Sequence, residues 1–279
     1  MAKNIIAYIL LAVLAVLCCI LAVRLIKIFG QGEMAVDGEW ELVWSDEFDY
    51  TGKPDASKWK YDVGGNGWGN GEIQYYTDGA NAHVDGGKLK IELRPEIYNG
   101  YDYTSARIVS IEGWTYGRFE ISARLPSGIG TWPAIWMLET NKTTEWPFGG
   151  EIDIMEHVGY NLNQVHHTVH TGRFNGMLGT HKGSSRYVEG ATENFNIYAL
   201  EWLPDKLEYY INRELVFTYD PSNYADPVTE QEWRFDRPFS LILNIAYGGT
   251  WGGQLGTDDS ALPAVMEIDY VRVYQKSSR

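Results

Sequence analysis

Apolar and polar residues alternate along most of the chain after residue 30. In the stretch 116–125, Phe119 and Ile121 fall on one side of an extended backbone, and Arg118 and Glu120 fall on the other. Similar alternation recurs in the stretches 88–94, 164–171, 207–219, 239–245 and 266–274, and 30 glycines can supply turns between them. No stretch after residue 30 keeps a helical period for about three turns. The pattern predicts one all-β domain, a sandwich or jelly roll of two packed antiparallel sheets.

A different pattern precedes this domain, an unbroken apolar run from Ile5 to Val23. As an α-helix the run is about 28 Å long, which matches the apolar core of a bilayer. We therefore expect a transmembrane or signal-anchor helix over residues 1–29, a polar linker over 30–38 and the folded domain over 39–279. A cleaved secretory signal is the alternative, but the run is long for a signal core and no small-x-small cleavage site follows it.

Composition narrows the ligands that the domain can bind. Three of the 23 basic residues lie before residue 30, so 20 remain against 37 acidic residues, a net charge of −17. This charge argues against nucleic acids and other polyanions and leaves neutral polysaccharides open. The 11 Trp and 19 Tyr are too many to be only core, so some rings are expected to line a binding surface. Both cysteines, Cys18 and Cys19, lie in the apolar run, which excludes cysteine chemistry from the domain.

Three carboxylates stand close together in the segment that begins at Glu151. Glu151 and Asp153 project to one side of a strand, but Glu156 lies at an odd offset that would turn it into the apolar side. A buried and unpaired carboxylate is costly. We therefore predict a β-bulge near Met155 that returns Glu156 to the side of the other two acids.

Two carboxylates on one surface can cleave a glycosidic bond, one as nucleophile and the other as acid and then base. With the bulge, the Cα atoms of Glu151 and Glu156 are expected about 13 Å apart. Their side chains can then bring the carboxyl groups near the roughly 5 to 5.5 Å that a retaining enzyme needs. Repulsion within the cluster raises at least one carboxyl pKa, so one Glu should stay protonated. Taken alone, the residues leave catalysis, a solvated acidic strand and a calcium ligand set open.

Nine segments between residues 44 and 274 are specific in combination. They read WSDEF (44–48), NGWGNGEIQYY (66–76), YTSAR (103–107), YGRFE (116–120), WPAIWML (132–138), EIDIMEHVG (151–159), HTVHTG (167–172), LNIAYGGTW (243–251) and DYVRVY (269–274). In this order they resemble glycoside hydrolase family 16, and within it the laminarinase-like endo-β-1,3-glucanases. The resemblance implies a β-jelly-roll with a concave substrate cleft, a neutral β-glucan substrate and net retention of anomeric configuration.

The resemblance also implies roles for single residues. Glu151 matches the nucleophile, Glu156 the general acid/base and Asp153 an assisting carboxylate. The inserted Met155 resembles the laminarinase type, whereas enzymes specific for mixed-linkage glucan lack this residue. The matching positions for aromatic platforms and other cleft residues are Trp132, Trp136, His170, Arg94, Asn66, Asn70, Glu72, Gln74 and Trp251.

Similar enzymes often bind one structural calcium ion on the convex side, and no catalytic cofactor is implied. The matching ligands are Glu47, a glycine after Asp85, here Gly86, and Asp269. Oxygen ligands from distant segments are chemically reasonable for Ca²⁺.

The leading hypothesis is a membrane-anchored, monomeric endo-hydrolase of laminarin-like glucans. Such polymers occur outside the cytoplasm, so the domain should be exported, or secreted if the apolar run is cleaved. Lys3 would then be cytoplasmic, although Arg24 and Lys27 on the outer flank run against the positive-inside rule. One alternative is the same fold acting on mixed-linkage β-1,3-1,4-glucan or transferring glycosyl units. The other is a non-catalytic β-glucan receptor, a class that loses the catalytic glutamates, both of which are present here.

Overall fold

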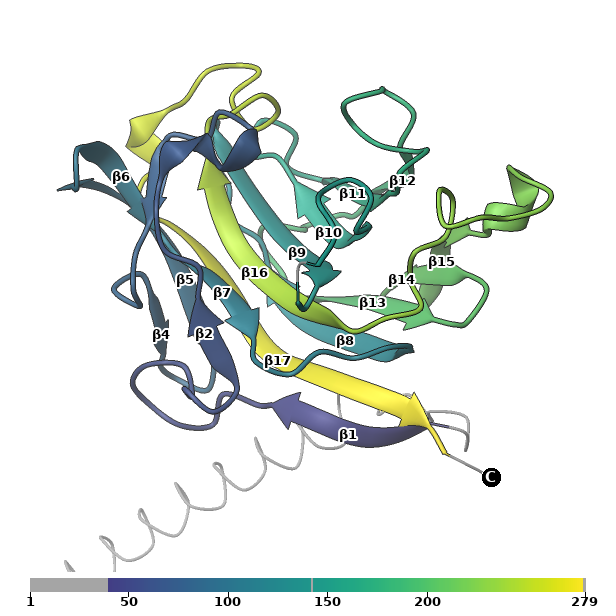
Figure 1. Ribbon diagram of the computed structural model, residues 1–279. Coiled ribbons are helices and arrows are strands. Elements are labelled where there is room, and N and C mark those ends of the chain that lie inside the picture. The colour runs from purple at the N-terminus through teal and green to yellow at the C-terminus, as the bar shows by residue number, and fades with distance from the viewer. Residues whose placement is uncertain (1–39, 142, 278–279) are drawn as a thin grey trace, which may run out of the picture. The chain divides into compact units, whose positions relative to one another are not determined.

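The computed structural model describes residues 40–141 and 143–277 (Figure 1). The helix predicted over 1–29 and the linker predicted over 30–38 lie outside these residues, so both stay predictions. In the described part of the chain, no helical segment has the length and apolar character needed to cross a bilayer. The larger of two compact units, Leu42–Gln275, holds the elements that position the candidate site.

One sheet has ten strands. Its main path runs in the order β15 (Glu214–Tyr219), β14 (Leu207–Ile211), β13 (Asn196–Trp202), β8 (Gly117–Arg124), β17 (Ala264–Lys276), β5 (Leu89–Tyr98), β6 (Tyr101–Ser105) and β3 (Gln74–Tyr76). Two more strands pair beside this path, β1 (Trp40–Asp46) with β17 and β4 (Ala82–Val84) with β5. Strands β3 and β6 run parallel, so the expectation of wholly antiparallel sheets does not hold for this pair.

The other sheet has seven strands. Their order is β12 (Lys182–Tyr187), β11 (Gln164–His170), β10 (Glu151–His157), β9 (Thr131–Glu139), β16 (Phe239–Tyr247), β7 (Arg107–Ser110) and β2 (Trp59–Tyr61). Short 3-10 helices in the described connections are η1 (Asn66–Gly69), η2 (Pro221–Asn223) and η3 (Asp259–Ala261). Figure 1 shows β9, β10 and β16 of this sheet lying over β8, β13 and β17 of the other. The predicted all-β fold of two packed sheets is confirmed.

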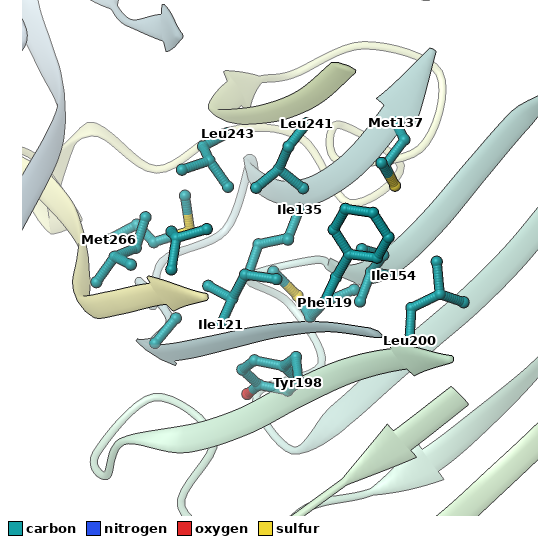
Figure 2. Close-up of a cluster of buried hydrophobic side chains, with 14 of the residues drawn as sticks. Phe119, Ile121, Ile135, Met137, Ile154, Tyr198, Leu200, Leu241, Leu243 and Met266 are labelled. Carbon is teal, nitrogen blue, oxygen red and sulfur yellow. The ribbon is translucent and has the colours of Figure 1, made fainter. Parts of the chain in front are cut away.

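The core lies between the two sheets, as Figure 2 shows. Phe119 and Ile121 of β8 meet Ile135 of β9, Ile154 of β10 and Leu243 of β16, and all five side chains are fully buried. Each such side chain contributes about 1.5–3 kcal/mol when it leaves water. The inner face of the seven-stranded sheet is therefore fixed by packing, and its outer face is left for the candidate site.

Strand β8 is also buried on its polar face, which the alternation did not indicate. The Arg118 guanidinium lies over the ring of Tyr210, pairs with Glu120 at 2.7 Å and contacts Glu201. Neighbouring strands β13 and β17 flank β8 on both sides. Paired charges and an aromatic ring therefore cover this face, which would be exposed to solvent on an edge strand.

The alternating stretch 207–219 forms two strands rather than one. β14 ends at Ile211, β15 begins at Glu214, and the two pair as a hairpin. Asn212 and Arg213 have φ values of 48° and 75°, the left-handed conformation that a two-residue hairpin turn needs. Because this turn contains no glycine, the alternating pattern shows no clear break at this point.

Candidate active site

Strand β10 carries the three acids and lies between β9 and β11, so its backbone is paired on both edges. Against β9 the register shifts between Asp153 and Met155, and against β11 it shifts between Asp153 and Glu156. Ile154 and Met155 both point into the core and are fully buried. Two successive inward side chains return Glu156 to the outer face, where its charge acts on Glu151. The predicted β-bulge near Met155 is confirmed.

The His170 imidazole faces two of the acids from β11. Its Nε2 atom lies 3.5 Å from Asp153 Oδ2 and 3.7 Å from Glu151 Oε1. The Asp153 side chain is 3% exposed, whereas the Glu151 and His170 side chains are 17% and 14% exposed. A ligand can therefore reach Glu151 and His170, and Asp153 acts from beneath them.

The environments of Asp153 and Glu156 favour their protonated forms. Burial raises the pKa of Asp153 well above its usual value, and the charges of Glu151 and Glu156 raise it further. Burial raises the pKa of Glu156 to about 7, although hydrogen bonds from Trp132 and Thr168 act in the opposite direction. Near neutral pH, both groups can hold a proton that a reaction needs.

Glu151 differs from the other two acids because a cation acts on it. Burial and the charge of Glu156 raise the pKa of Glu151 to about 8, although the charge of Arg107 and hydrogen bonds with Trp146 and Asp153 act in the opposite direction. Three neighbouring carboxyls titrate together and cannot all ionise at neutral pH. Asp153 therefore keeps a proton, and the charge of Arg107 together with the hydrogen bonds from Trp146 and Asp153 favours the anion at Glu151.

Glu156 is held by side chains of β9 and β11. Trp132 Nε1 donates to Glu156 Oε1 at 3.1 Å, and Thr168 Oγ1 donates to Oε2 at 3.2 Å. The Trp132 ring meets Trp251 edge to face at 5.4 Å between centroids, and Trp251 meets His166 at 4.9 Å. The structure thus brings Trp132 to the carboxyl group of Glu156 and packs Trp251, also singled out in the sequence, against the Trp132 ring.

Trp136 lies at the start of a chain of hydrogen bonds. Its Nε1 donates to Asn244 Oδ1 at 2.7 Å, and Asn244 Nδ2 donates to the Tyr76 hydroxyl at 3.0 Å. Tyr76 in turn donates to Glu72 Oε2 at 3.0 Å. This chain fixes the indole plane of Trp136 on the outer face of the sheet.

Glu72 also accepts hydrogen bonds from two other residues singled out in the sequence. Gln74 Nε2 donates to Oε2 at 2.7 Å, and Asn70 Nδ2 donates to Oε1 at 3.3 Å. Gln74 is fully buried and accepts from the Tyr247 N–H at 2.7 Å. Glu72 is 8% exposed. These contacts place Glu72 and Gln74 in the wall behind Trp136 rather than on an open ligand surface.

The structure does not bring the remaining two of these residues, Asn66 and Arg94, to the acids. Asn66 begins η1, and its N–H donates to the Tyr101 hydroxyl at 2.7 Å. Arg94 follows the fully buried Leu93 on β5, so the strand turns Arg94 away from the core, where it pairs with Glu92. In the described structure, the contacts of both residues lie outside the group of three acids.

Arg107 joins the site although no sequence pattern indicated it. Its guanidinium carbon lies 4.7 Å from the ring centroid of Trp68 and 4.6 Å from that of Trp136. Its Nε lies 3.1 Å from Asp62 Oδ2, and the residue is 7% exposed. Arginine is rarely buried without a partner or a function. The signal in the sequence that could have indicated Arg107 was its place in the segment 103–107, which resembles the family.

Trp146 is a second site residue that the sequence reading missed. It lies in the connection 140–150 between β9 and β10, and its ring packs against that of His170 at 5.7 Å between centroids. Trp146 is 41% exposed, which is high for an indole. The signal was a tryptophan only five residues before Glu151.

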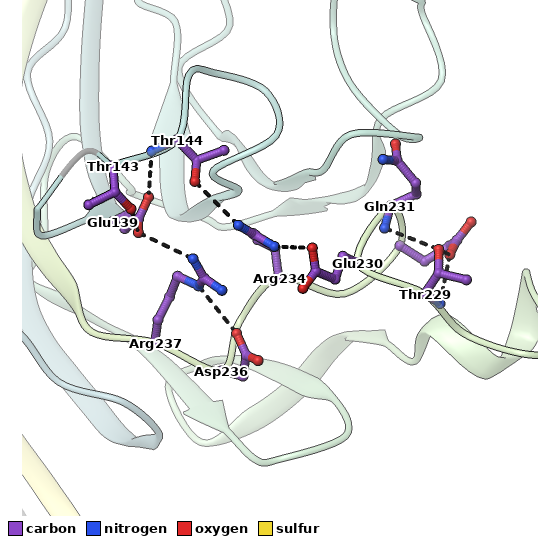
Figure 3. Close-up of polar contacts among 10 residues, drawn as sticks. Glu139, Thr143, Thr144, Thr229, Glu230, Gln231, Arg234, Asp236 and Arg237 are labelled. Carbon is purple, nitrogen blue, oxygen red and sulfur yellow. Dashed lines mark hydrogen bonds and ion pairs between the residues drawn. The ribbon is translucent and has the colours of Figure 1, made fainter.

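Polar contacts shown in Figure 3 hold the connection that carries Trp146. Glu139 at the end of β9 accepts from Thr143 Oγ1 at 2.6 Å and from the Thr144 N–H at 3.3 Å. Arg237 Nη1 lies 3.5 Å from the same carboxylate, and Arg234 Nη2 donates to Thr144 Oγ1 at 3.3 Å. Two segments far apart in sequence are thus joined at Glu139, which is 7% exposed.

Replacing Glu139 by alanine is expected to destabilise the domain by about 1–3 kcal/mol, because half-buried donors and the Arg237 guanidinium lose the acceptor that joins their segments. Thermal or denaturant unfolding measures the loss. The matched control is Glu189→Ala, since Glu189 is exposed and should change stability by less than about 0.5 kcal/mol. Equal effects of the two substitutions would contradict the structural role of the Glu139 contacts.

The predicted calcium ligands lie on or near β17. Both carboxylate oxygens of Glu47 accept from Arg272, at 2.9 Å each. Asp269 lies where the register between β17 and β8 shifts, and Gly86 lies in the turn between β4 and β5 with a φ of 60°. The Glu47 carboxylate is therefore already paired with the Arg272 guanidinium. In this arrangement the Glu47 side chain does not fit a calcium site.

Comparisons with known proteins agree with the fold. Residues 67–272 match the family described as glycosyl hydrolases family 16. The beta-glucanase of Rhodothermus marinus is 55% identical over 244 residues, which cover 85% of each chain. Among solved structures, the laminarinase from Rhodothermus marinus has a TM-score of 0.83 at 54% identity, over 86% of this chain and 98% of that one.

A second solved structure, a non-specific endo-beta-1,3(4)-glucanase, has a TM-score of 0.82 at 41% identity. The match covers 88% of this chain and 94% of the other. Identity at this level over nearly the whole of both chains goes beyond a shared fold. The chain belongs to glycoside hydrolase family 16.

Proposed function

We propose that this glycoside hydrolase is an endo-acting enzyme that cleaves internal β-1,3-glucosidic bonds of laminarin-like glucans with retention of configuration. The observation that carries the proposal is the bulge in β10, which puts Glu151, Asp153 and Glu156 on one outer face. Relatives named as a laminarinase and as beta-glucanases support the substrate class.

Each of the two glutamates has a separate task in this proposal. The Glu151 carboxylate attacks the anomeric carbon, while Glu156 donates its proton to the departing glycosidic oxygen. The resulting ester between Glu151 and the sugar is then hydrolysed by a water molecule. Glu156 takes a proton from that water, and Glu151 leaves as a carboxylate, so both groups end as they began.

Asp153 and the tryptophans support these steps. Protonated Asp153 can donate to Glu151 and so stabilise its anion before attack. The indoles of Trp132, Trp136 and Trp251 are partly exposed beside the acids, and flat apolar rings of this kind suit the faces of glucose units. Neutral stacking surfaces agree with an acidic domain that binds an uncharged polymer.

The closest alternative is the same machinery acting on mixed-linkage β-1,3-1,4-glucan, or passing the glycosyl unit to another sugar. One relative is itself named a non-specific endo-beta-1,3(4)-glucanase, which favours testing both polymers. Product analysis should show a ladder of short oligosaccharides from laminarin, with the β-anomer formed first in the NMR spectrum. Failure to release oligosaccharides from either glucan would refute the proposed activity, and a first-formed α-anomer would refute retention.

A structural calcium ion forms a separate part of the proposal. Because Arg272 occupies the Glu47 carboxylate, we infer that calcium at this place would use the Asp269 side chain with main-chain oxygens of Glu47 and Gly86. Oxygen ligands of this mixed kind are common for Ca²⁺. The ion would pin three segments together and would take no part in the chemistry.

Adding calcium to chelator-treated protein is expected to raise Tm, since a ligand at a hundredfold excess over its Kd stabilises by about 2.7 kcal/mol. Differential scanning calorimetry measures the change. Asp269→Asn should remove most of the rise, whereas Asp85→Asn, at an exposed position of the neighbouring turn, should keep it. An unchanged Tm in wild-type protein would contradict the calcium proposal.

We also propose that the domain acts outside the cytoplasm as a monomer, held at the membrane by the apolar run 5–23. The support is the length of this run and the place where polysaccharides occur. Cell fractionation should find the activity in the membrane fraction, with Met1 or a residue close to it at the amino terminus. A mature protein that begins after residue 23 would show that the run is a cleaved signal.

A further inference from the structure

His170 is held on several sides by neighbouring segments. The Gly176 N–H donates to Nδ1 of His170 at 3.1 Å, from the connection between β11 and β12. Trp146 packs against one part of the ring at 5.7 Å between centroids, and His181 packs against another at 5.6 Å. These contacts fix both the position of the imidazole and the direction in which Nε2 points.

The hydrogen bond from Gly176 decides which ring nitrogen carries the proton. A backbone N–H can only donate, so Nδ1 must offer its lone pair. A neutral imidazole has one N–H, which therefore sits on Nε2. Burial, with the charge of nearby His181, lowers the pKa of His170 to about 4, so the ring is neutral under ordinary conditions.

An oxygen atom that lacks a hydrogen-bond donor lies near the Nε2–H group. Asp153 Oδ2 is buried, has no hydrogen-bond partner among the described residues, and lies 3.5 Å from Nε2. Glu151 Oε1 lies 3.7 Å from the same nitrogen. Hydrogen bonds of catalytic groups are often long before substrate binds and shorten in the complex. One N–H is thus placed to serve both carboxyl groups.

The same three residues resemble a metal site, since one ligand atom from each lies within 4.8 Å of the others. A metal would need the lone pair of Nε2. A neutral ring has only one nitrogen with a free lone pair. Because Nδ1 accepts from the Gly176 N–H, this nitrogen is Nδ1, on the far side of the ring. The hydrogen-bond geometry therefore favours a proton at the centre of this cluster over a metal.

We propose that His170 is a positioning residue, held as the Nε2–H tautomer by the backbone of Gly176, whose proton is shared between Asp153 and Glu151. This proposal rests on the proposed glycosidase function, because it gives His170 the task of aiming Glu151 and stabilising its anion. The charged groups around it are Glu151 and Asp153 on β10 and His181 beside β12, and Glu156 and Arg107 act on Glu151.

The tautomer can be measured directly in the folded protein. With ¹⁵N-labelled histidine, the two ring nitrogens of His170 are assigned by comparison with the spectrum of His170→Gln. We expect Nε2 to be protonated and Nδ1 unprotonated from about pH 5 to pH 8. A proton on Nδ1, or on both nitrogens, would overturn the proposal whatever the substrate of the enzyme is.

Kinetics test the consequence for Glu151. His170→Phe keeps a ring between Trp146 and His181 but removes the donor, so kcat/KM should fall about ten- to a hundredfold. The acid limb of its pH profile should move to higher pH, because the Glu151 anion loses a donor. His170→Gln restores an amide N–H and should recover at least about tenfold. Equal losses in both variants, or an unmoved acid limb, would show that His170 only fills space.

Two controls separate this proposal from the proposed function. His83→Gln alters a histidine of β4 that pairs with Glu92 and makes no described contact with the three acids, and it should leave the acid limb where it is. Micromolar Zn²⁺ should not inhibit competitively, and inhibition that His170→Gln abolishes would mean that Nε2 offers a lone pair. If the wild-type protein cleaves no glucan, the proposed function fails, whereas the NMR and Zn²⁺ measurements still decide the tautomer.

Discussion

Replacing Glu151 by alanine should abolish glucan hydrolysis, with kcat reduced at least about 10⁴-fold. Without this carboxylate no covalent intermediate forms, and Glu156 cannot substitute because its proton is needed by the leaving oxygen. Azide should restore turnover of an activated aryl glycoside, since the small anion fits the space of the lost side chain. Its product should be a glycosyl azide of inverted configuration, which NMR identifies.

The matched control is Glu145→Ala, an exposed acid in the connection just before β10, which should keep normal turnover. Laminarin binding should survive in Glu151→Ala, because the indoles beside the acids are unchanged. Near-normal hydrolysis by Glu151→Ala would place the nucleophile elsewhere. If wild-type protein binds laminarin without any turnover, the chain is a receptor rather than an enzyme.

Replacing Glu156 by glutamine should reduce kcat on laminarin by about 10²–10⁴-fold, because an amide cannot donate the proton that the leaving sugar needs. An aryl glycoside with an acidic leaving group should suffer much less. Burial raises the pKa of Glu156 to about 7, so wild-type activity should fall as the pH rises through that value and the acid loses its proton. This basic limb should be missing from the pH profile of the variant.

Thr168→Val provides a sharper control for the same group. Thr168 donates to Glu156 Oε2 at 3.2 Å, and this hydrogen bond lowers the pKa of Glu156. Its removal should move the basic limb of the pH profile to higher pH in an enzyme that still has its acid. A basic limb that persists unchanged in Glu156→Gln would assign the limb to another group.

Local alternation in the sequence was enough to predict the strand and the bulge that carry the three acids, whereas their interpretation as a catalytic site came from the resemblance to family 16. A strand has a period of two residues, so Glu151, Asp153 and Glu156 can share a face only if one extra residue is inserted between them. The register against both neighbouring strands shifts at that place. The core face of β8 followed from the same period, since its apolar positions recur at every second residue.

Contacts between distant segments could not be read from this period. Arg107 reaches the site because it pairs with Asn244 of β16, which accepts from Trp136. Strand order is a property of the folded chain, and alternation carries no information about it. The orientation of Arg94 away from the core does follow from this period, since its neighbour Leu93 is buried.

The bulge in β10 reverses which positions, odd-numbered or even-numbered, face the core. Before it, Glu151 and Asp153 face outward, and after it the odd-numbered His157 is fully buried. Because Met155 fills the core, the extra residue is anchored by about 2 kcal/mol of apolar burial and cannot slide along the strand. The gap between the two glutamates is thus set from the inner side of the sheet, by a residue that never meets the sugar. A substitution in the core at Met155 can therefore change this gap while every side chain on the outer face of β10 stays the same.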